Sequence, residues 1–338
     1  MVHDSFVIST YVQLLREYLH QSKLVPAQLL SAEQLALLDA AAAQAGQGRF
    51  SRQALSAILR QVQQQIQHPA LGLDIARNIT AAHLGVLGYL ILACSSLGEA
   101  LVRLDRYGRL IDDALEMNIR QTDQFIELSW PVLPPHEAVF VELGVAVVVQ
   151  FARNVTGQDA PMSAVGFAHT QMGAMPTYRQ FFGGSVAFGQ EFTFLRFPIA
   201  YLALPLRQPD GVLLGILEAQ ANQAMSLLPR TDVFLQEVRG LLVRLCREGA
   251  PTLEQVAQVL CMTPRTLQRR LAEHGVRFQP LLDEIRWQLC EQYLQDERLQ
   301  LADIALLLGY SDQSALTRAY RRWTGKTPHQ QRRQGDRR

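Results

Sequence analysis

Two short groups of polar side chains near the C-terminal end have the chemistry that reads the edges of DNA base pairs. The first group is Arg265, Thr266, Gln268 and Arg269, and the second is Gln313, Ser314, Thr317 and Arg318. Arginine can donate two hydrogen bonds to guanine, and glutamine can bond adenine in a similar bidentate way. The alternative is that these side chains only solvate an outer helix face. The elements that position them decide between the two interpretations.

Both groups lie within copies of one pattern, at residues 253–271 and 301–320. The apolar residues that open each copy are spaced i, i+3, i+4 and i+7, which is one face of a helix. They are Leu253, Val256, Ala257 and Leu260 in the first copy and Leu301, Ile304, Ala305 and Leu308 in the second. Two copies of similar design within one stretch favour base reading over a merely solvated face.

Each copy then turns and begins a second helix. Thr263 is a good N-cap, and Pro264 follows at the first helical position. In the second copy Gly309 supplies a left-handed turn, and Ser311 or Asp312 caps the next helix. Helix, short turn and helix form the helix-turn-helix signature, whose second helix enters the DNA major groove with its N-terminal residues at the base edges.

The second helices keep their apolar residues inward, namely Leu267 and Leu271 in the first copy and Leu316 and Tyr320 in the second. Between the copies, helical spacing of apolar residues predicts a helix from Pro280 to Asp296, about 25 Å long. That length suits a linker helix that holds two recognition helices about one DNA turn, roughly 34 Å, apart.

This region resembles the DNA-binding domain of the AraC/XylS family of bacterial transcription regulators. The resemblance rests on MTPRTLQRRL (262–271), Ile285-Arg286, DIALLLGYSDQSALTRAYRRWTGKTP (303–328) and the final arginine-rich helix. It implies base-reading positions at Arg265, Gln268 and Arg269 and at Gln313, Ser314, Thr317 and Arg318. We assign contacts with the DNA backbone to Arg321, Arg322 and Lys326.

Two residues depart from the family pattern. Cys261 stands where the first turn usually has glycine, and a non-glycine residue costs about 1 kcal/mol if the position is left-handed. Leu316 stands where an aromatic residue is frequent, which we expect to be a tolerated exchange in the core.

The preceding residues indicate an α+β domain. Amphipathic or apolar periodicity predicts helices at 6–20 and 50–67, the second with Ser51 as its N-cap. Alternation of apolar and polar residues within 115–131, with a turn at Thr122-Asp123, predicts a β-hairpin. Further strands are expected at 164–168 and 191–197.

Residues from about 27 to 225 are similar to the arabinose-binding-like sensor domain of the ornithine-utilisation and virulence subfamilies of AraC-type regulators. The similarity rests on HLGVLGYLILACSSLGEAL (83–101), RYGRLIDD (106–113) and YRQFFGGSVAFGQ (178–190). It implies effector sensing and, often, dimerisation. It does not make arabinose the ligand, since effectors of this group include amino-acid and lipid-like molecules.

Candidate effector contacts are His83, Tyr89 and Tyr107, which are polar side chains in an apolar helical region. The alternative is that all three are ordinary core residues with satisfied hydrogen bonds. The apolar surroundings favour a lipophilic or aromatic effector over a sugar.

Composition agrees with a DNA-binding C-terminal part. Residues 250–338 hold 14 Lys and Arg against 10 Asp and Glu, whereas residues 1–249 hold 18 against 21. The basic end carries the helix pairs, as contact with phosphate requires. The four cysteines have no CxxC spacing, so we expect them to be reduced and the protein to be cytoplasmic.

No membrane segment or catalytic pattern is predicted. The N-terminus lacks the features of a signal peptide, and the longest apolar run, Val139–Phe151, is interrupted by Glu142 and too short to span a bilayer. The motifs GxSxG, HExxH and the P-loop are missing, and the eight histidines are scattered. Asp112, Asp113 and Glu116 resemble a carboxylate pair, but we interpret them as the solvated face of a helix end. We expect no enzyme activity, cofactor or metal.

These observations predict a transcription regulator with an α+β N-terminal sensor domain at 1–228 and a linker helix at 229–249. An all-α domain with two helix-turn-helix motifs, joined by a linker helix, follows at 250–333, and a frayed tail at 334–338. We expect a homodimer that binds promoter DNA under control of a small-molecule effector and acts with RNA polymerase, by analogy as an activator. Two alternatives remain open: an enzyme-like N-terminal domain fused to a DNA-binding module, and a constitutive DNA binder without ligand control.

Overall fold

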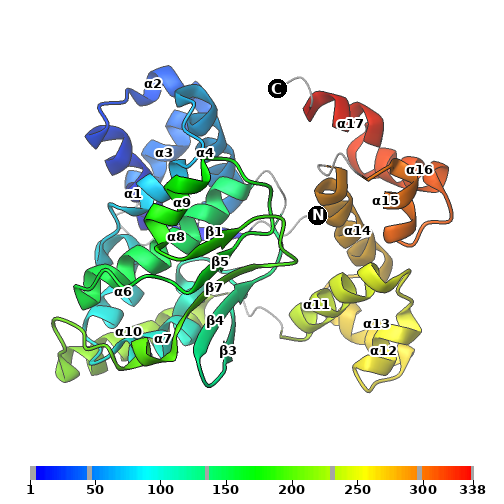
Figure 1. Cartoon of the computed structure of the whole chain (residues 1–338). Helices are drawn as coiled ribbons and strands as arrows, with labels where there is room; N and C mark the ends of the chain where they lie inside the picture. Colours follow the sequence, from blue (N-terminus) through cyan, green and yellow to red (C-terminus); the bar gives the residue numbers. More distant parts are fainter. Residues whose placement is uncertain (1–4, 44–47, 134–136, 229–232, 295–298, 336–338) are drawn as a thin grey trace. The chain divides into compact units, whose positions relative to one another are not determined.

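The chain divides into two compact units, Met1–Pro229 and Arg230–Arg338. A computed structural model describes residues 5–43, 48–133, 137–228, 233–294 and 299–335 (Figure 1). Strands and helices mix in the first unit, whereas the described part of the second unit is helical.

The first unit contains ten helices among its described residues and two sheets. The helices are α1 (Ser9–Gln21), α2 (Pro26–Leu29), α3 (Ala32–Ala43), α4 (Arg52–Ile66), α5 (Leu71–Ala76), α6 (Gly85–Leu92), α7 (Leu97–Tyr107), α8 (Ala138–Thr156), α9 (Met175–Phe182) and α10 (Gly211–Leu227). Short 3-10 turns are η1 (Ala81–Leu84), η2 (Gly108–Leu110) and η4 (Ile199–Ala203). The strands are β1 (Phe6–Ile8), β2 (Arg49–Ser51), β3 (Asn118–Gln121), β4 (Phe125–Trp130), β5 (Ala164–Gly166), β6 (Ser185–Ala187) and β7 (Thr193–Pro198).

The larger sheet has the strand order β3-β4-β7-β5-β6. Neighbouring strands are antiparallel except β5 and β6, which are parallel. Strands β3 and β4 form the predicted hairpin, and the Thr122 hydroxyl accepts the N–H of Phe125 at 3.1 Å in its turn. Strands β5 and β7 confirm the two strands predicted at 164–168 and 191–197.

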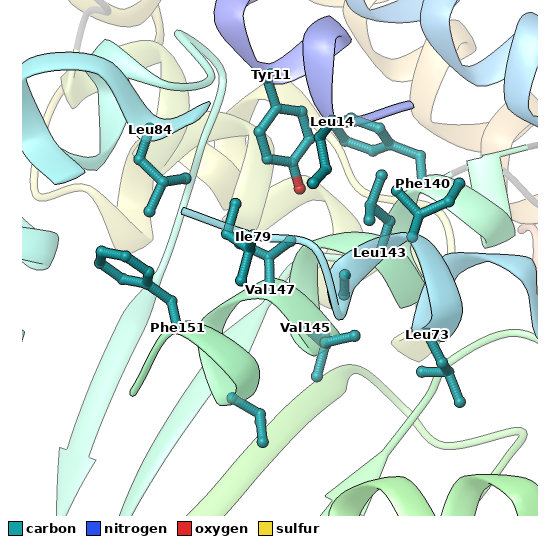
Figure 2. Packing of buried hydrophobic residues seen from close by; sticks show 14 of the residues in the cluster. Tyr11, Leu14, Leu73, Ile79, Leu84, Phe140, Leu143, Val145, Val147 and Phe151 are labelled. Atoms are coloured by element: carbon teal, nitrogen blue, oxygen red, sulfur yellow. The ribbon is translucent and has the colours of Figure 1, made fainter. Parts of the chain in front are cut away.

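Helix α8 lies at the centre of the first unit's core. Figure 2 shows Phe140 and Leu143 from α8 together with Tyr11 and Leu14 from α1, and the rings of Tyr11 and Phe140 meet edge to face with centroids 6.5 Å apart. Helix α5 packs so closely on α8 that a Cβ at Gly72 would lie 2.8 Å from the Leu143 nitrogen. Among the described helices, α8 is long and apolar enough to cross a membrane, but 61% of that stretch is buried inside the unit.

The predicted starts of two N-terminal helices are wrong. Helix α1 begins at Ser9 and α4 at Arg52, because Phe6–Ile8 and Arg49–Ser51 pair as antiparallel strands. Ser51 does cap α4, since its hydroxyl accepts the Ala54 N–H at 3.3 Å. Pairing between segments more than 40 residues apart in sequence overrides the local helical pattern here.

The interpretation of Asp112 and Asp113 as a solvated face is also wrong. Asp112 is 7% exposed and lies 3.5 Å from the Arg52 guanidinium, while Asp113 lies 2.9 Å from Arg49. Arg52 also contacts Glu137 at 3.3 Å. Burial raises the pKa of Asp112, an effect that the nearby Arg52 guanidinium opposes. Asp112 and Asp113 therefore join the segment after α7 to β2 and to the start of α4.

The second unit contains the helices α11 (Val233–Glu248), α12 (Leu253–Val259), α13 (Pro264–Glu273), α14 (Phe278–Leu294), α15 (Leu301–Leu307), α16 (Gln313–Thr324) and α17 (Pro328–Gly335). Helix α14 is the helix predicted from Pro280, and its 17 residues span about 25 Å. Its buried residues share one core with α12, α13, α15 and α16. Helix α11, predicted as a linker, packs Phe234, Val238 and Leu242 into the same core.

Candidate functional site

The turn between α12 and α13 has a left-handed residue at its centre. Cys261 has a φ of 54°, its N–H bonds to the Gln258 carbonyl at 3.0 Å, and the Met262 N–H bonds to the Ala257 carbonyl at 2.9 Å. This pair of bonds is the Schellman arrangement that ends many helices. Thr263 then caps α13 as predicted, because its hydroxyl accepts the Thr266 N–H at 3.2 Å.

The turn between α15 and α16 repeats that arrangement with glycine. Gly309 has a φ of 74°, its N–H bonds to Leu306 at 3.0 Å, and the Tyr310 N–H bonds to Ala305 at 2.8 Å. A Cβ at Gly309 would lie 2.7 Å from the Cα of Ala250, which connects α11 and α12. Glycine is therefore needed in the second turn for its conformation and for the close approach of the chain before the first motif.

Asp312, rather than Ser311, caps α16. Its carboxylate accepts the Ala315 N–H at 2.8 Å and the Ser311 hydroxyl at 3.0 Å. These hydrogen bonds, the one from Ala315 foremost, hold the pKa of Asp312 below its usual value. The cap therefore stays ionised at neutral pH and fixes the first turn of α16.

Helix α13 presents one stripe of predicted base-reading residues. Leu267 and Leu271 are buried, and Arg265, Gln268 and Arg269 are exposed on the opposite side. Their spacing, i, i+3 and i+4, keeps them on one face. Arg269 also pairs with Glu273 at 3.6 Å, an exposed contact of little energy. Thr266 lies off this stripe, half-buried, with its hydroxyl 2.9 Å from that of Thr263.

Helix α16 presents a matching stripe. Its buried residues are Leu316, Ala319 and Tyr320, and the positions i, i+3, i+4 and i+7 on the outer face are Ser314, Thr317, Arg318 and Arg321. Gln313 is exposed at the first helical position, and its carbonyl accepts the Thr317 hydroxyl at 2.8 Å. Arg318 thus corresponds to Arg269 of the first motif.

The three residues predicted to contact the DNA backbone differ in their surroundings. Arg321 is exposed and shares the outer stripe with Arg318. Arg322 points toward α14, where its guanidinium lies 2.9 Å from the Asp283 carboxylate. Lys326 is exposed and follows Gly325, whose φ of 76° ends α16. The charge of Arg322 is thus already paired within the unit.

Helices α11 and α14 hold the two motifs. The guanidinium of Arg270 on α13 lies 4.0 Å from the centre of the Phe234 ring on α11. The buried Arg286 on α14 lies 5.0 Å from the centre of the Tyr310 ring, which follows the second turn. The Tyr320 hydroxyl on α16 donates to Glu291 of α14. Packing and cation–π contacts thus fix both recognition helices to one frame.

The three predicted effector contacts are not joined to one another in the structure. His83 is buried, its Nδ1 accepts the Thr80 N–H at 3.0 Å, and its Nε2 lies 3.2 Å from Glu17. The buried Tyr107 hydroxyl donates to Asn222 of α10 at 2.9 Å. Tyr89 is 47% exposed. Among the described residues, no hydrogen bond or ring contact links any two of the three.

Comparison with known proteins bears on both units. Residues 26–206 match the family model described as the arabinose-binding domain of AraC transcription regulator, N-terminal, and residues 256–334 match a helix-turn-helix domain. The chain belongs to the AraC family of transcription regulators. The relatives described next are named as regulators, one of them as an HTH-type transcriptional regulator.

Two curated relatives align along most of their length. The chain is 33% identical to the ornithine utilization regulator of Pseudomonas aeruginosa over 83% of this chain and 84% of that one. It is 32% identical to the HTH-type transcriptional regulator VirS of Mycobacterium tuberculosis, over 80% and 81%. A solved structure of the transcriptional regulator CdpR from Pseudomonas aeruginosa is 20% identical, covers 96% of this chain and 98% of its own, and has a TM-score of 0.46.

A buried polar cluster that the sequence analysis missed lies in the arabinose-binding-like part of this AraC-family protein. The Glu142 side chain on α8 is fully buried, and its Oε1 accepts the Tyr178 hydroxyl at 2.7 Å. That hydroxyl in turn accepts the Gly173 N–H at 3.2 Å, and the His169 Nε2 lies 3.9 Å from Oε1. Burial raises the pKa of Glu142 to about 8 and lowers the pKa of His169.

One signal in the sequence could have drawn attention to this cluster. Glu142 interrupts the apolar run 139–151, and a charged side chain on the buried face of a helix requires an explanation. The residues that meet it, His169 and Tyr178, are separated from it by 27 and 36 positions, and only folding shows the encounter. Among the described residues, no group of His, Cys, Asp and Glu is arranged to hold a metal ion, and the four cysteines are free.

Proposed function

We propose that this regulator reads a specific promoter with both helix-turn-helix motifs and that a small molecule bound to the first unit controls it. The matched pair of recognition helices is the observation that supports sequence-specific DNA binding. Both begin after the same left-handed turn, both are capped by a side chain, and both expose polar residues along one face. Helix N-termini with arginine at the outer face suit contact with base edges and phosphates.

Within this proposal the base-reading residues are Arg265, Thr266, Gln268, Arg269, Gln313, Ser314, Thr317 and Arg318. The stripes favour Arg265, Gln268 and Arg269 over the half-buried Thr266. For the backbone we propose Arg321, Arg322 and Lys326, with a smaller contribution from Arg322 than from Arg321 because Asp283 already pairs with Arg322.

Ligand control is supported by the match of the first unit to an arabinose-binding domain. We place the sensing domain at 1–228 and the DNA-binding domain at 250–333. The division of the chain into one compact unit that ends at Pro229 and another that begins at Arg230 supports this placement. Packing of α11 into the second core favours counting the helix within 229–249 as part of the DNA-binding domain. We further propose a cytoplasmic homodimer that activates transcription through RNA polymerase. His83, Tyr89 and Tyr107 remain proposed effector contacts, although the partners of His83 and Tyr107 suit structural roles better.

The test begins with selection of a DNA target from a random library by the full-length protein. Binding of that target is then measured by fluorescence anisotropy at several salt concentrations for wild type, Arg265→Ala and Arg318→Ala. Each change should weaken binding by about 1–3 kcal/mol and relax preference at one base pair, with an unaltered salt slope for a pure base contact. Equal weakening on target and unrelated DNA would instead assign that arginine to phosphate. Failure of selection to enrich any sequence would contradict specific recognition.

A further inference from the structure

The side chain of Glu142 is 0% exposed and has no Arg or Lys partner among the described residues, and burial lowers the pKa of His169, which lies 3.9 Å away. Isolating a carboxylate from water in this way is costly, and a buried acid is usually paired or forced into its neutral form. The carboxyl stands on the central helix α8 of the core, where an apolar side chain would pack without that cost. A carboxyl at this position therefore points to a role other than stability.

Two polar atoms of the cluster lack a hydrogen-bond partner among the described residues. Tyr178 donates to Oε1 of Glu142, and Oε2 is buried without a partner in the described part of the chain. The His169 Nδ1 lies 2.9 Å from the Thr170 carbonyl. A carbonyl only accepts, so Nδ1 carries the proton and Nε2 of the neutral ring is an acceptor. Nε2 too is buried without a described partner. The Glu142 Oε2 and the His169 Nε2 are therefore both buried without a hydrogen-bond partner in the described part of the chain.

We propose that Glu142, His169 and Tyr178 form the recognition site for a primary ammonium group of the effector, with Phe167 and Phe188 around its hydrocarbon stem. This inference rests on the proposal that the first unit binds a small molecule. An ammonium group supplies three N–H donors, which match the acceptors of the carboxylate and of His169. Because Oε1 and Nε2 are 3.9 Å apart, one nitrogen can lie about 2.8 Å from both.

The aromatic surroundings fit the same ligand class. The ring of Phe188 is stacked on that of Phe167 with centroids 5.3 Å apart, and it meets the ring of Tyr178 edge to face at 4.9 Å. His169 lies 5.2 Å from Phe167 and 5.7 Å from Phe188. Aromatic faces attract cations, and most strongly where water is excluded. An ammonium group on an apolar chain would therefore be held by charge, hydrogen bonds and rings together.

Entry would take place through the two loops that cover the acid. Phe188 is half-buried, and the loop residue Gly189 after it has a φ of 66° and no atom near its Cβ direction. His169 precedes the exposed Thr170 in the other loop, and the Gly189 N–H bonds to the His169 carbonyl at 3.1 Å. Separation of the His169 and Phe188 rings would open a path to Glu142 without disturbing α8.

Proton linkage gives the site a distinctive signature. Without ligand, burial keeps the Glu142 carboxyl neutral up to a pKa of about 8, and ammonium binding requires the carboxylate. Binding should therefore release a proton below pH 8, with a gain in affinity of about tenfold for each pH unit up to that point. The titratable groups that face Glu142 are Tyr178 and His169, and the residue of α5 against it is Gly72, which does not titrate.

The experiment is calorimetric titration of the full-length protein with n-butylammonium between pH 6 and 8, in buffers of different ionisation enthalpy. The uncharged n-butanol and the N–H-free tetramethylammonium ion are the ligand controls. We expect binding of n-butylammonium with proton release, and markedly weaker binding of both controls. Glu142→Gln should weaken binding by more than about tenfold, since a buried charge pair is lost. Glu127→Gln changes a buried acid that Arg196 already pairs with, and it should bind as wild type does.

Tyr178→Phe provides a second variant if Glu142→Gln does not fold, and it should weaken binding several-fold. Undetectable n-butylammonium binding by the wild type, or unaltered binding by both variants, would overturn the assignment. DNA binding is measured on the same samples to separate the two proposals. Intact DNA recognition without amine binding rejects this site alone. Amine binding that changes neither DNA affinity nor transcription leaves the site standing and rejects ligand control.

Discussion

The two turns of the helix-turn-helix motifs provide a paired test, because they share a backbone conformation and differ in residue. Cys261 has a φ of 54° and Gly309 a φ of 74°. A side chain in this left-handed region costs about 1–2 kcal/mol. Replacing the residue with glycine removes this strain, but it also gives the unfolded chain more freedom, which reduces the gain in stability by about 0.4–1 kcal/mol. We predict that Cys261→Gly stabilises the second unit by about 0.5–1 kcal/mol.

The reverse change at the second turn should cost more than the first change gains. Gly309→Ala introduces the same left-handed strain, and its Cβ would lie 2.7 Å from the Cα and 2.8 Å from the nitrogen of Ala250. Because these are backbone atoms, the chain between α11 and α12 must move, which adds about 1–3 kcal/mol of overpacking strain. The reduced freedom of the unfolded chain offsets a small part of this, and we predict that Gly309→Ala lowers the stability of the second unit by about 2–4 kcal/mol.

Urea unfolding measures both changes in a Trp130→Phe background. The remaining tryptophans, Trp287 and Trp323, both belong to the second unit, so their fluorescence reports that unit alone. Cys261→Ser is the matched control, since it removes the thiol but keeps a side chain in the left-handed region, and it should change stability little. A destabilising Cys261→Gly, or a Gly309→Ala that costs under about 1 kcal/mol, would refute the strain argument.

Three further predictions concern charge and packing. Burial raises the folded-state pKa of Glu142 to about 8. The contribution of its carboxyl to the free energy of unfolding is therefore complete below about pH 4.5 and declines as pH rises toward 8, by up to about 1.4 kcal/mol per pH unit. Glu142→Gln should remove that pH dependence in thermal unfolding at pH 5 to 8. Arg321→Ala should reduce the salt dependence of DNA binding by about one unit of slope, whereas Arg322→Ala should reduce it less, and equal slopes would show that the ion pair of Arg322 opens on DNA. Leu316→Ala empties a fully buried position and should cost about 2–5 kcal/mol in urea unfolding, with a cost under about 1 kcal/mol contradicting the core assignment.

Local patterns in the sequence were sufficient for the second unit's motifs. The spacing of apolar residues, the cap at Thr263 and the glycine at Gly309 depend on interactions within a few residues, and the structure has all of them. The sequence left the conformation of Cys261 open, at a position where the resembling family usually has glycine, and the structure gives it a φ of 54°. The hairpin of β3 and β4 is equally local, since four positions separate Gln121 from Phe125. Such features can be predicted because their partners are neighbours in the chain.

Tertiary structure alone decided the features whose partners lie far apart in sequence. Pairing of β1 with β2 converts the predicted start of a helix into a strand, and Arg52 turns an apparently solvated Asp112 into part of an ion-pair cluster. The predicted linker helix α11 joins the core of the second unit. Glu142 was visible only as an interruption in an apolar run, because folding determines which side chains surround it. A buried carboxyl takes its pKa, its hydrogen bonds and its chemistry from such neighbours, and no local sequence pattern specifies them.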